Sequence, residues 1–169
     1  MIQPQVNNLS GKFVPLQDSQ ENEEMDVDLN EIVQTICNGY TTTGKSFILR
    51  SDRLPHVNGN KEALILLFSE LIYTIISHPP QNSKLFLYIT CREQPQDAEV
   101  MDLRFTGNFK MYLIDLHTNI TSDELWMNLY KNKLEECSVL IHQIGGSFSF
   151  FPICNTGCLF SISLPGKIK

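Results

Sequence analysis

Residues 61–77 form the segment that most limits how this chain can fold. Their sequence, KEALILLFSELIYTIIS, places aliphatic and aromatic side chains around almost the whole circumference of a helix, and Pro79 and Pro80 end it. Such a helix is typical of a domain interior, because its apolar run is too short to span a bilayer. One carboxylate, Glu70, lies within it. A charge among aliphatic neighbours is costly unless it faces a pocket or an ionic partner, so its position bears directly on function.

The size and composition of the chain indicate one folded domain. Of its 169 residues, 42% are hydrophobic and 19% are charged, which suits a sizeable core. Residues 1–25 are rich in Gln, Asn, Ser and Glu and are interpreted as a polar leader or linker, so the domain is expected to span residues 26–169. The net charge of −6, with no basic block, argues against a protein that binds nucleic acid or membrane surfaces.

The cysteines and the first residues favour the cytoplasm. The five cysteines are odd in number and include no Cys-x-x-Cys pair, which is typical of small core residues in a reducing compartment. Cys154 and Cys158 lack a second pair of ligands, so no metal site is expected. The first residues are polar rather than basic and then apolar, so no signal peptide is expected.

The remaining patterns predict helices and hairpins. A helix capped by Asp28 should end near Gly39, and a longer one should begin at a Ser122 cap. The longer helix has an apolar stripe made of Trp126, Tyr130, Leu134, Cys137, Ile141 and Ile144. Strands are predicted at residues 46–52, 84–93, 100–105, 110–117, 147–153 and 158–164, with residues 54–60 as a turn or loop. This order predicts an α+β fold, a two-layer α/β sandwich with a mixed, mostly antiparallel sheet and helices on one face.

A nucleotide motif at residues 39–46 is rejected because of its surroundings. GYTTTGKS matches the pattern G-x-x-x-x-G-K-[ST], in which Lys45 and Ser46 would hold phosphates and magnesium. That mechanism needs a strand before the loop and a helix after it, because the helix N-terminus supplies amide groups and the dipole. Here a capped helix precedes the motif and a strand follows it. The match is therefore interpreted as a chance feature of a helix-to-strand turn.

Three segments occur in the order and spacing of a known domain. VDLNEIV matches its first helix, residues 54–78 match its polar turn and nucleotide-facing helix, and residues 134–165 match its last helix, paired glycines and closing hairpin. The sequence therefore resembles the ATP-binding domain of two-component sensor histidine kinases, of the Bergerat or GHKL type, and most of all the phytochrome-type kinases. The resemblance covers residues 27–165 and implies the α/β sandwich of that family and a role in a bacterial phosphorelay.

The resemblance gives two residues of the apolar helix a place in the nucleotide site. In that family an Asn of this helix binds the magnesium of the triphosphate, and many relatives hold a general base one turn earlier. Glu70 falls at the position of the base and Thr74 at that of the Asn. A threonine hydroxyl is a poorer magnesium ligand than an amide oxygen. The resemblance thus implies that the carboxylate is retained and the metal ligand is lost.

The other nucleotide motifs of the family are altered as well. Its adenine-binding D-x-G-x-G is matched best by FTGNF, where Gly107 is kept, Phe105 replaces the Asp and Phe109 replaces a glycine. Counting back from the paired glycines puts Lys131 and Lys133 in the place of the glycine-rich lid, inside a continuous helix. None of the four histidines has the sequence context of the phosphorylated histidine of that family.

Three hypotheses follow. The first is a degenerate kinase-like domain that binds no ATP, needs no cofactor and is a regulatory or protein-interaction module, with a kinase dimerisation domain, a response regulator or a second copy as partner. The second is a working ATP-binding catalytic domain of a sensor kinase, with Glu70 as base, Lys131 or Lys133 on the phosphates, and ATP and magnesium as cofactors. The third is an unrelated α+β domain. The altered motifs favour a protein that is not an enzyme.

Two further points stay open at the level of sequence. Glu70 is either a remnant of a nucleotide pocket or simply the ionic partner of Arg92 or Arg104 on a neighbouring strand. A partner protein could add a strand to the open edge near the polar leader, or dock on residues 110–126 with Tyr112 as an anchor. Trp126, in the same region, is more typical of a core residue.

Overall fold

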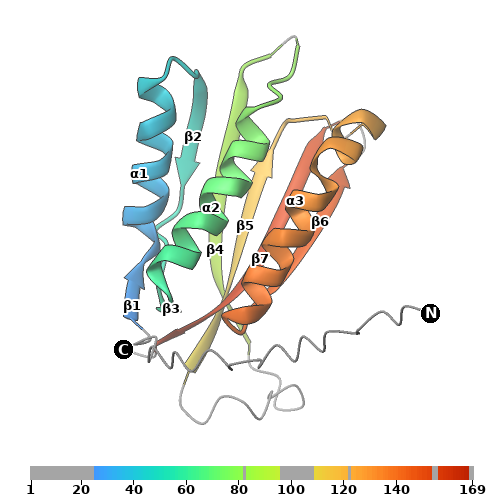
Figure 1. Cartoon of the computed structure of the whole chain (residues 1–169). Coiled ribbons are helices and arrows are strands. Elements are labelled where there is room, and N and C mark those ends of the chain that lie inside the picture. Colours follow the sequence, from blue (N-terminus) through green and yellow to red (C-terminus); the bar gives the residue numbers. More distant parts are fainter. Residues whose placement is uncertain (1–24, 82, 96–108, 122, 154–155, 168–169) are drawn as a thin grey trace, which may run out of the picture.

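A computed structural model describes residues 25–81, 83–95, 109–121, 123–153 and 156–167, in which three helices lie on one face of a five-stranded sheet (Figure 1). The sheet has the order β2-β4-β5-β7-β6, with β2 and β4 parallel and every other neighbouring pair antiparallel. The predicted two-layer α/β sandwich is therefore confirmed. The elements are β1 Met25–Asp28, α1 Leu29–Thr42, β2 Phe47–Ser51, β3 His56–Gly59, α2 Lys61–Ile76, β4 Leu85–Gln94, β5 Phe109–Thr118, α3 Glu124–Gln143, β6 Ser147–Ile153 and β7 Gly157–Lys167.

Helix α2 lies between α1 and α3 on the sheet (Figure 1), and most of its side chains are buried, as its apolar sequence predicted. Six of its side chains are completely buried: Leu64, Leu67, Phe68, Leu71, Ile72 and Ile75. It is not enclosed on every side, however. Ile65, Leu66 and Tyr73 are 40%, 49% and 46% exposed, because the helix has no neighbour on its outer side among the described residues. We call these three side chains the α2 stripe.

Helix α3 packs on the sheet through the stripe that the sequence predicted. Trp126 is only 2% exposed and stacks on Phe150 of β6, with ring centroids 5.4 Å apart, and its edge meets Phe160 of β7. The other stripe residues are buried, apart from the half-buried Ile144. The cap is Asp123, whose carboxylate accepts a hydrogen bond from the amide of Trp126 at 2.8 Å. The expected cap, Ser122, lies outside the described residues.

Two predictions at the start of the domain were wrong. Helix α1 continues past Gly39 to Thr42, because the glycine with a left-handed backbone that follows the helix is Gly44, with φ of 82°, and not Gly39. Residues 54–60 are not only a loop, since His56–Gly59 forms β3 and pairs with β1. The segment after α1 leads directly into β2, as a helix-to-strand turn should. This order confirms the argument against a phosphate-binding loop.

Part of the region expected to dock a partner is interior. Residues 110–118 belong to β5, which lies in the middle of the sheet between β4 and β7, and Trp126 is a core residue. This strand therefore has no free edge for a partner strand, and Trp126 is not an exposed anchor, but Tyr112 is half-buried and docking on this region stays a prediction. The predicted strand at residues 100–105 lies outside the described residues.

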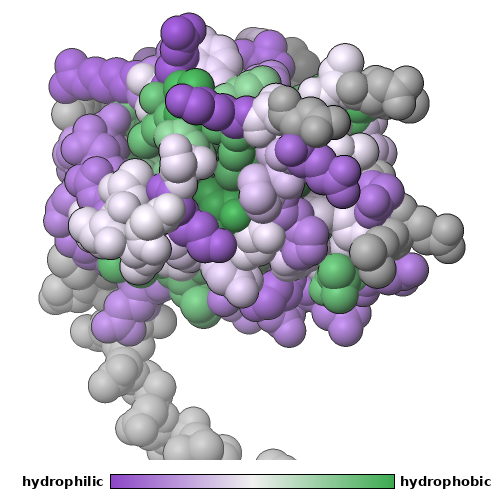
Figure 2. Space-filling view, turned by 90° about the horizontal axis from the view of Figure 1, so that it is seen from above, coloured by the Kyte–Doolittle hydropathy of each residue, from purple (hydrophilic) through white to green (hydrophobic). Residues whose placement is uncertain are grey.

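Some apolar surface remains outside the core. The outer face of the sheet carries Ile48, Phe86 and Tyr88, all exposed. Figure 2 looks down on the end of the molecule where α1 and α2 finish and shows apolar residues gathered in a recess with a hydrophilic rim. None of the described helices combines the length and the apolarity needed to cross a bilayer.

Candidate functional site

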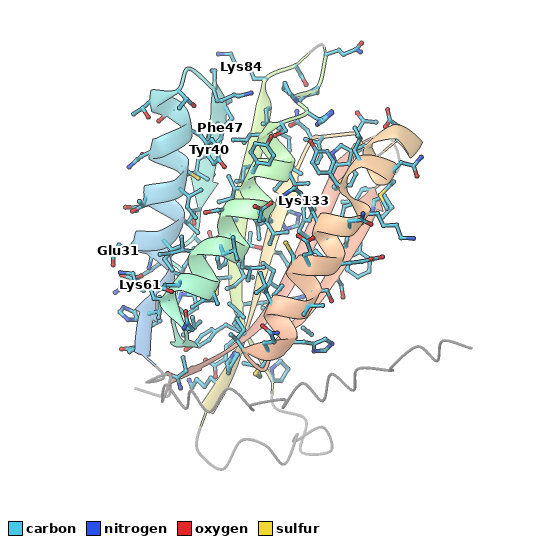
Figure 3. The ribbon with its side chains drawn as sticks, in the orientation of Figure 1. Glu31, Tyr40, Phe47, Lys61, Lys84 and Lys133 are labelled. Atoms are coloured by element: carbon cyan, nitrogen blue, oxygen red, sulfur yellow. The ribbon has the colours of Figure 1, made fainter. Side chains whose placement is uncertain are left out.

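Glu70 projects from α2 toward α3, where Lys133 binds it. The Nζ atom of Lys133 donates to Oε2 of Glu70, and the side chains are 39% and 31% exposed respectively. Figure 3 shows Lys133 between the two helices. The hydrogen bond to Glu70 raises the pKa of Lys133, against the opposing effect of burial. The costly carboxylate noted in the sequence thus has an ionic partner and stands at the protein surface.

Arg92, one of the two expected partners of Glu70, lies on the wrong side of the sheet. Leu87 and Ile89 of β4 point into the core beneath the helices, and alternation along the strand places Arg92 on the outer face. The prediction of Arg92 was wrong for this reason. Arg104 lies outside the described residues.

Thr74 sits one turn after Glu70 but faces the interior. Its side chain is 1% exposed, and its hydroxyl donates to the backbone carbonyl of Glu70 at 2.8 Å. A threonine that bonds back to the preceding turn of its own helix uses its only donor there. The structure therefore brings Glu70, Thr74 and Lys133 together, with their polar groups directed at one another or at the backbone.

The lysines assigned to the lid lie on a regular helix. Helix α3 runs without interruption from Glu124 to Gln143, so Lys131 and Lys133 lie within it as the sequence predicted. Lys131 is exposed and has no ion pair with a described residue, whereas Lys133 is bound to Glu70. The backbone here has no loop that could fold over a ligand.

Of the residues assigned to the adenine motif, the structure describes the backbone position of Phe109. Phe109 begins β5 and pairs with Lys167, whereas the far end of β5, at Thr118, adjoins the segment that leads to α3. A strand of this length separates its two ends by about 30 Å. Phe105 and Gly107 lie outside the described residues.

A hollow of about 660 Å³ lies beyond the C-terminal end of α2, and we call it the His78 hollow. The segments after α2 and β5, the start of α3 and the β6–β7 turn line it, with His78, Ser83, Asn119, Asp123, Trp126 and Gly157 among its residues. His78 is hydrogen-bonded to the hydroxyl of Tyr130 on α3 at 2.8 Å. None of the described residues that line it is Lys or Arg. The sequence analysis did not identify this hollow, because residues 78–83, 119–126 and 156–157, which are far apart in the sequence, build it.

The described residues contain no cluster of metal ligands, and two of their buried cysteines have unreactive thiols. They contain no group of three or more His, Cys, Asp or Glu side chains arranged to hold a metal. Burial raises the pKa of Cys37 to about 11 and that of Cys137 to about 12, so both thiols stay protonated at neutral pH.

Comparison with known proteins gives a fold. No protein-family model and no curated protein sequence matches the chain. Among solved structures it is similar to the histidine kinase AdeS of Acinetobacter baumannii, at 10% identity over 85% of this chain and 68% of that one, with a TM-score of 0.61. It is also similar to the catalytic domain of histidine kinase ThkA (12% identity, 85% and 97% covered, TM-score 0.61). It is similar as well to the ATP-binding domain of PrrB from Mycobacterium tuberculosis, at 13% identity over 86% of this chain and 99% of that one, with a TM-score of 0.59. The chain therefore has the α/β fold of the ATP-binding catalytic domains of histidine kinases.

Proposed function

We propose that this chain is a degenerate histidine-kinase-like domain that does not bind ATP tightly and that acts as a regulatory or protein-interaction module in two-component signalling, in the cytoplasm. The observation that carries the proposal is the contact between Lys133 and Glu70. It joins the residue at the position of the family's catalytic base to the helix that stands in the place of its nucleotide lid, and it leaves neither side chain free for a triphosphate.

The chemistry of the surrounding residues supports the same proposal. Magnesium prefers oxygen ligands in an open octahedral arrangement, but the Thr74 hydroxyl is buried and bonded to its own helix. These residues do not fit a magnesium triphosphate. Each lost polar contact to a ligand is worth about 1–3 kcal/mol, so losing the metal ligand, the lid and the adenine acceptor together would weaken ATP binding by several powers of ten.

The His78 hollow is large enough for a small molecule, since ligand pockets commonly measure about 300–1,000 Å³. Its described lining includes the carboxylate of Asp123 and no lysine or arginine. A triphosphate carries several negative charges and would meet repulsion there without compensating cations. The charge of this hollow therefore also supports loss of tight ATP binding.

An interaction role is supported by the α2 stripe. Ile65, Leu66 and Tyr73 form an exposed apolar row on the outer side of a helix that is otherwise well packed. Such a row suits the apolar face of a partner helix. A kinase dimerisation domain, a response regulator or a second copy of the chain would be the partner.

Titration calorimetry with ATP and magnesium tests the nucleotide part of the proposal. We expect no saturable heat at submillimolar ATP, and a micromolar dissociation constant would overturn the proposal.

Titration of purified candidate partners against the Leu66→Asp variant tests the interaction part. The matched control is Val139→Asp, which changes another exposed apolar residue, on α3 and outside the α2 stripe. We expect only Leu66→Asp to weaken binding, by about tenfold or more, since a buried charge at an interface is costly. Equal losses in both variants would refute a role for the α2 stripe.

A further inference from the structure

A second hollow, of about 550 Å³, lies at the other end of the sheet, and we call it the Arg53 hollow. Arg53 of the β2–β3 link and His56 of β3 form one side. Strands β4 and β5 form the other, through Arg92 and Lys110. Figure 1 shows β3 beside the ends of β4 and β5 that lie farthest from the start of α3. The Arg53 hollow shares no lining residue with the His78 hollow.

The charges of the Arg53 hollow are opposite to those of the whole chain. Three cationic side chains line it in a protein of net charge −6, and the one carboxylate among its described lining residues, Glu93, is bound to Lys110 at 2.9 Å. Arg53 and Arg92 form no ion pair with a described residue. Two guanidinium groups that line one concave site thus have no carboxylate partner in the part of the chain that the structure describes.

The neighbouring polar groups add donors and limit the chemistry. The phenol of Tyr112 and the thiol of Cys91 also line the hollow. Burial, reinforced by the carboxylates of Asp52 and Asp115, raises the pKa of Cys91 to about 11, so its thiol stays protonated and does not act as a nucleophile at neutral pH. The hollow is therefore suited to binding and not to covalent chemistry.

His56 contributes less to the attraction of an anion than its place in the lining suggests. Its Nδ1 and Nε2 atoms lie 3.5 Å and 3.8 Å from the carboxylates of Asp26 and Asp28. The two carboxylates therefore offset any positive charge on the His56 ring. The two arginines remain the main source of attraction.

We propose that the Arg53 hollow binds a phosphate group, either as the free ion or as the ester of a small molecule. Guanidinium groups match phosphate with paired hydrogen bonds, and two of them balance a dianion. A carboxylate carries a single negative charge and would balance only one of the two guanidinium groups. The volume of the hollow is that of a small-molecule site and exceeds what a bare ion needs.

Amide NMR shifts of the whole chain, titrated at constant ionic strength, test this proposal. The ligands are inorganic phosphate, phenyl phosphate and acetate. Arg53→Gln and Arg92→Gln are the test variants, and Arg50→Gln is the matched control, because Arg50 is also exposed but lies outside this hollow. Equal melting temperatures of all variants show that each one is folded.

We expect saturable shifts around residues 53–56, 91–93 and 110–112 with millimolar phosphate. Loss of either arginine should weaken binding by about tenfold or more, and Arg50→Gln should change it by less than about twofold. Tighter binding of phenyl phosphate than of inorganic phosphate would identify a phosphate ester as the ligand. The opposite order would identify the free phosphate ion. Equal affinity for acetate, no saturation, or equal effects of all three variants would overturn the proposal. ATP binding at the Glu70 site would leave these residues unshifted, so the two proposals can fail separately.

Discussion

Breaking the ion pair between Glu70 and Lys133 should cost only modest stability, because both side chains are about one-third exposed. Two unit charges about 4 Å apart attract by about 1 kcal/mol in water and about 4 kcal/mol at an effective dielectric constant of 20. Measured exposed pairs contribute about 0.2–1 kcal/mol, since solvent screens them and side-chain freedom is lost. We expect a coupling energy of about 0.5–1 kcal/mol between Glu70→Gln and Lys133→Met.

A double-mutant cycle measures this coupling from urea unfolding followed by the fluorescence of Trp126, the only tryptophan. The matched control is the pair between Lys61 and Glu31, at 3.3 Å, whose side chains are 43% and 63% exposed and whose coupling should be smaller. A coupling above about 3 kcal/mol would mean a buried pair and would refute this reasoning. The absence of coupling at low salt would show that the pair does not form.

The pH dependence of this pair has a definite sign. The pKa of Lys133 is higher in the folded protein than its ordinary value of 10.5. The stabilisation by the pair is therefore complete below the unfolded pKa and is lost as pH rises through the folded pKa. The coupling energy should be unchanged between pH 7 and pH 9 and should decline only in strongly alkaline solution.

Three other changes, with Val139→Ala as a control, test the packing, a helix cap and a turn by urea unfolding followed by circular dichroism, because one of them removes the only tryptophan. Trp126→Ala should lower the free energy of unfolding by about 3–5 kcal/mol, and Val139→Ala, at an exposed site, by less than about 0.5 kcal/mol. Asp28→Ala should cost about 1 kcal/mol, because its carboxylate accepts from the Asn30 amide at 2.9 Å at the start of α1. Hydrogen bonds from Asn30 lower the pKa of Asp28, so this contribution should be present above the ordinary value of 3.8 and disappear as pH falls through the folded pKa. Gly157→Ala should cost at least about 1–3 kcal/mol, because φ is 143° there and a Cβ would lie 1.9 Å from the Thr118 carbonyl oxygen. Equal losses for Trp126→Ala and Val139→Ala, or an unchanged stability for either of the other variants, would contradict the contacts described.

Local patterns predicted most of the fold. The stripe that begins at Trp126 identified α3 and its buried face, and the strands that became β4, β5, β6 and β7 were found from runs of β-branched and aromatic residues. The error at β3 had a different cause. His56–Gly59 is a strand only because it pairs with Met25–Asp28, and that pairing joins segments far apart in the sequence.

The candidate site was less predictable for the same reason. Glu70 was recognised as a residue that needs a partner, but Lys133 stands 63 positions later and became its partner through the packing of α3 against α2. The inward direction of Thr74 also depends on how α2 is rotated on the sheet. The α2 stripe was hidden in a sequence that is apolar almost all round, since periodicity could not show which side faces solvent.

Thermal unfolding with and without magnesium and ATP tests most directly whether this domain has lost tight nucleotide binding. A ligand at 100 times its dissociation constant adds about 2.7 kcal/mol to stability. For a domain of this size that corresponds to a rise in Tm of roughly 5–10 °C. We predict that Tm stays unchanged, within the scatter of a magnesium-only control, at submillimolar ATP. A rise of about 5 °C or more, retained in the Arg53→Gln variant, would contradict the account.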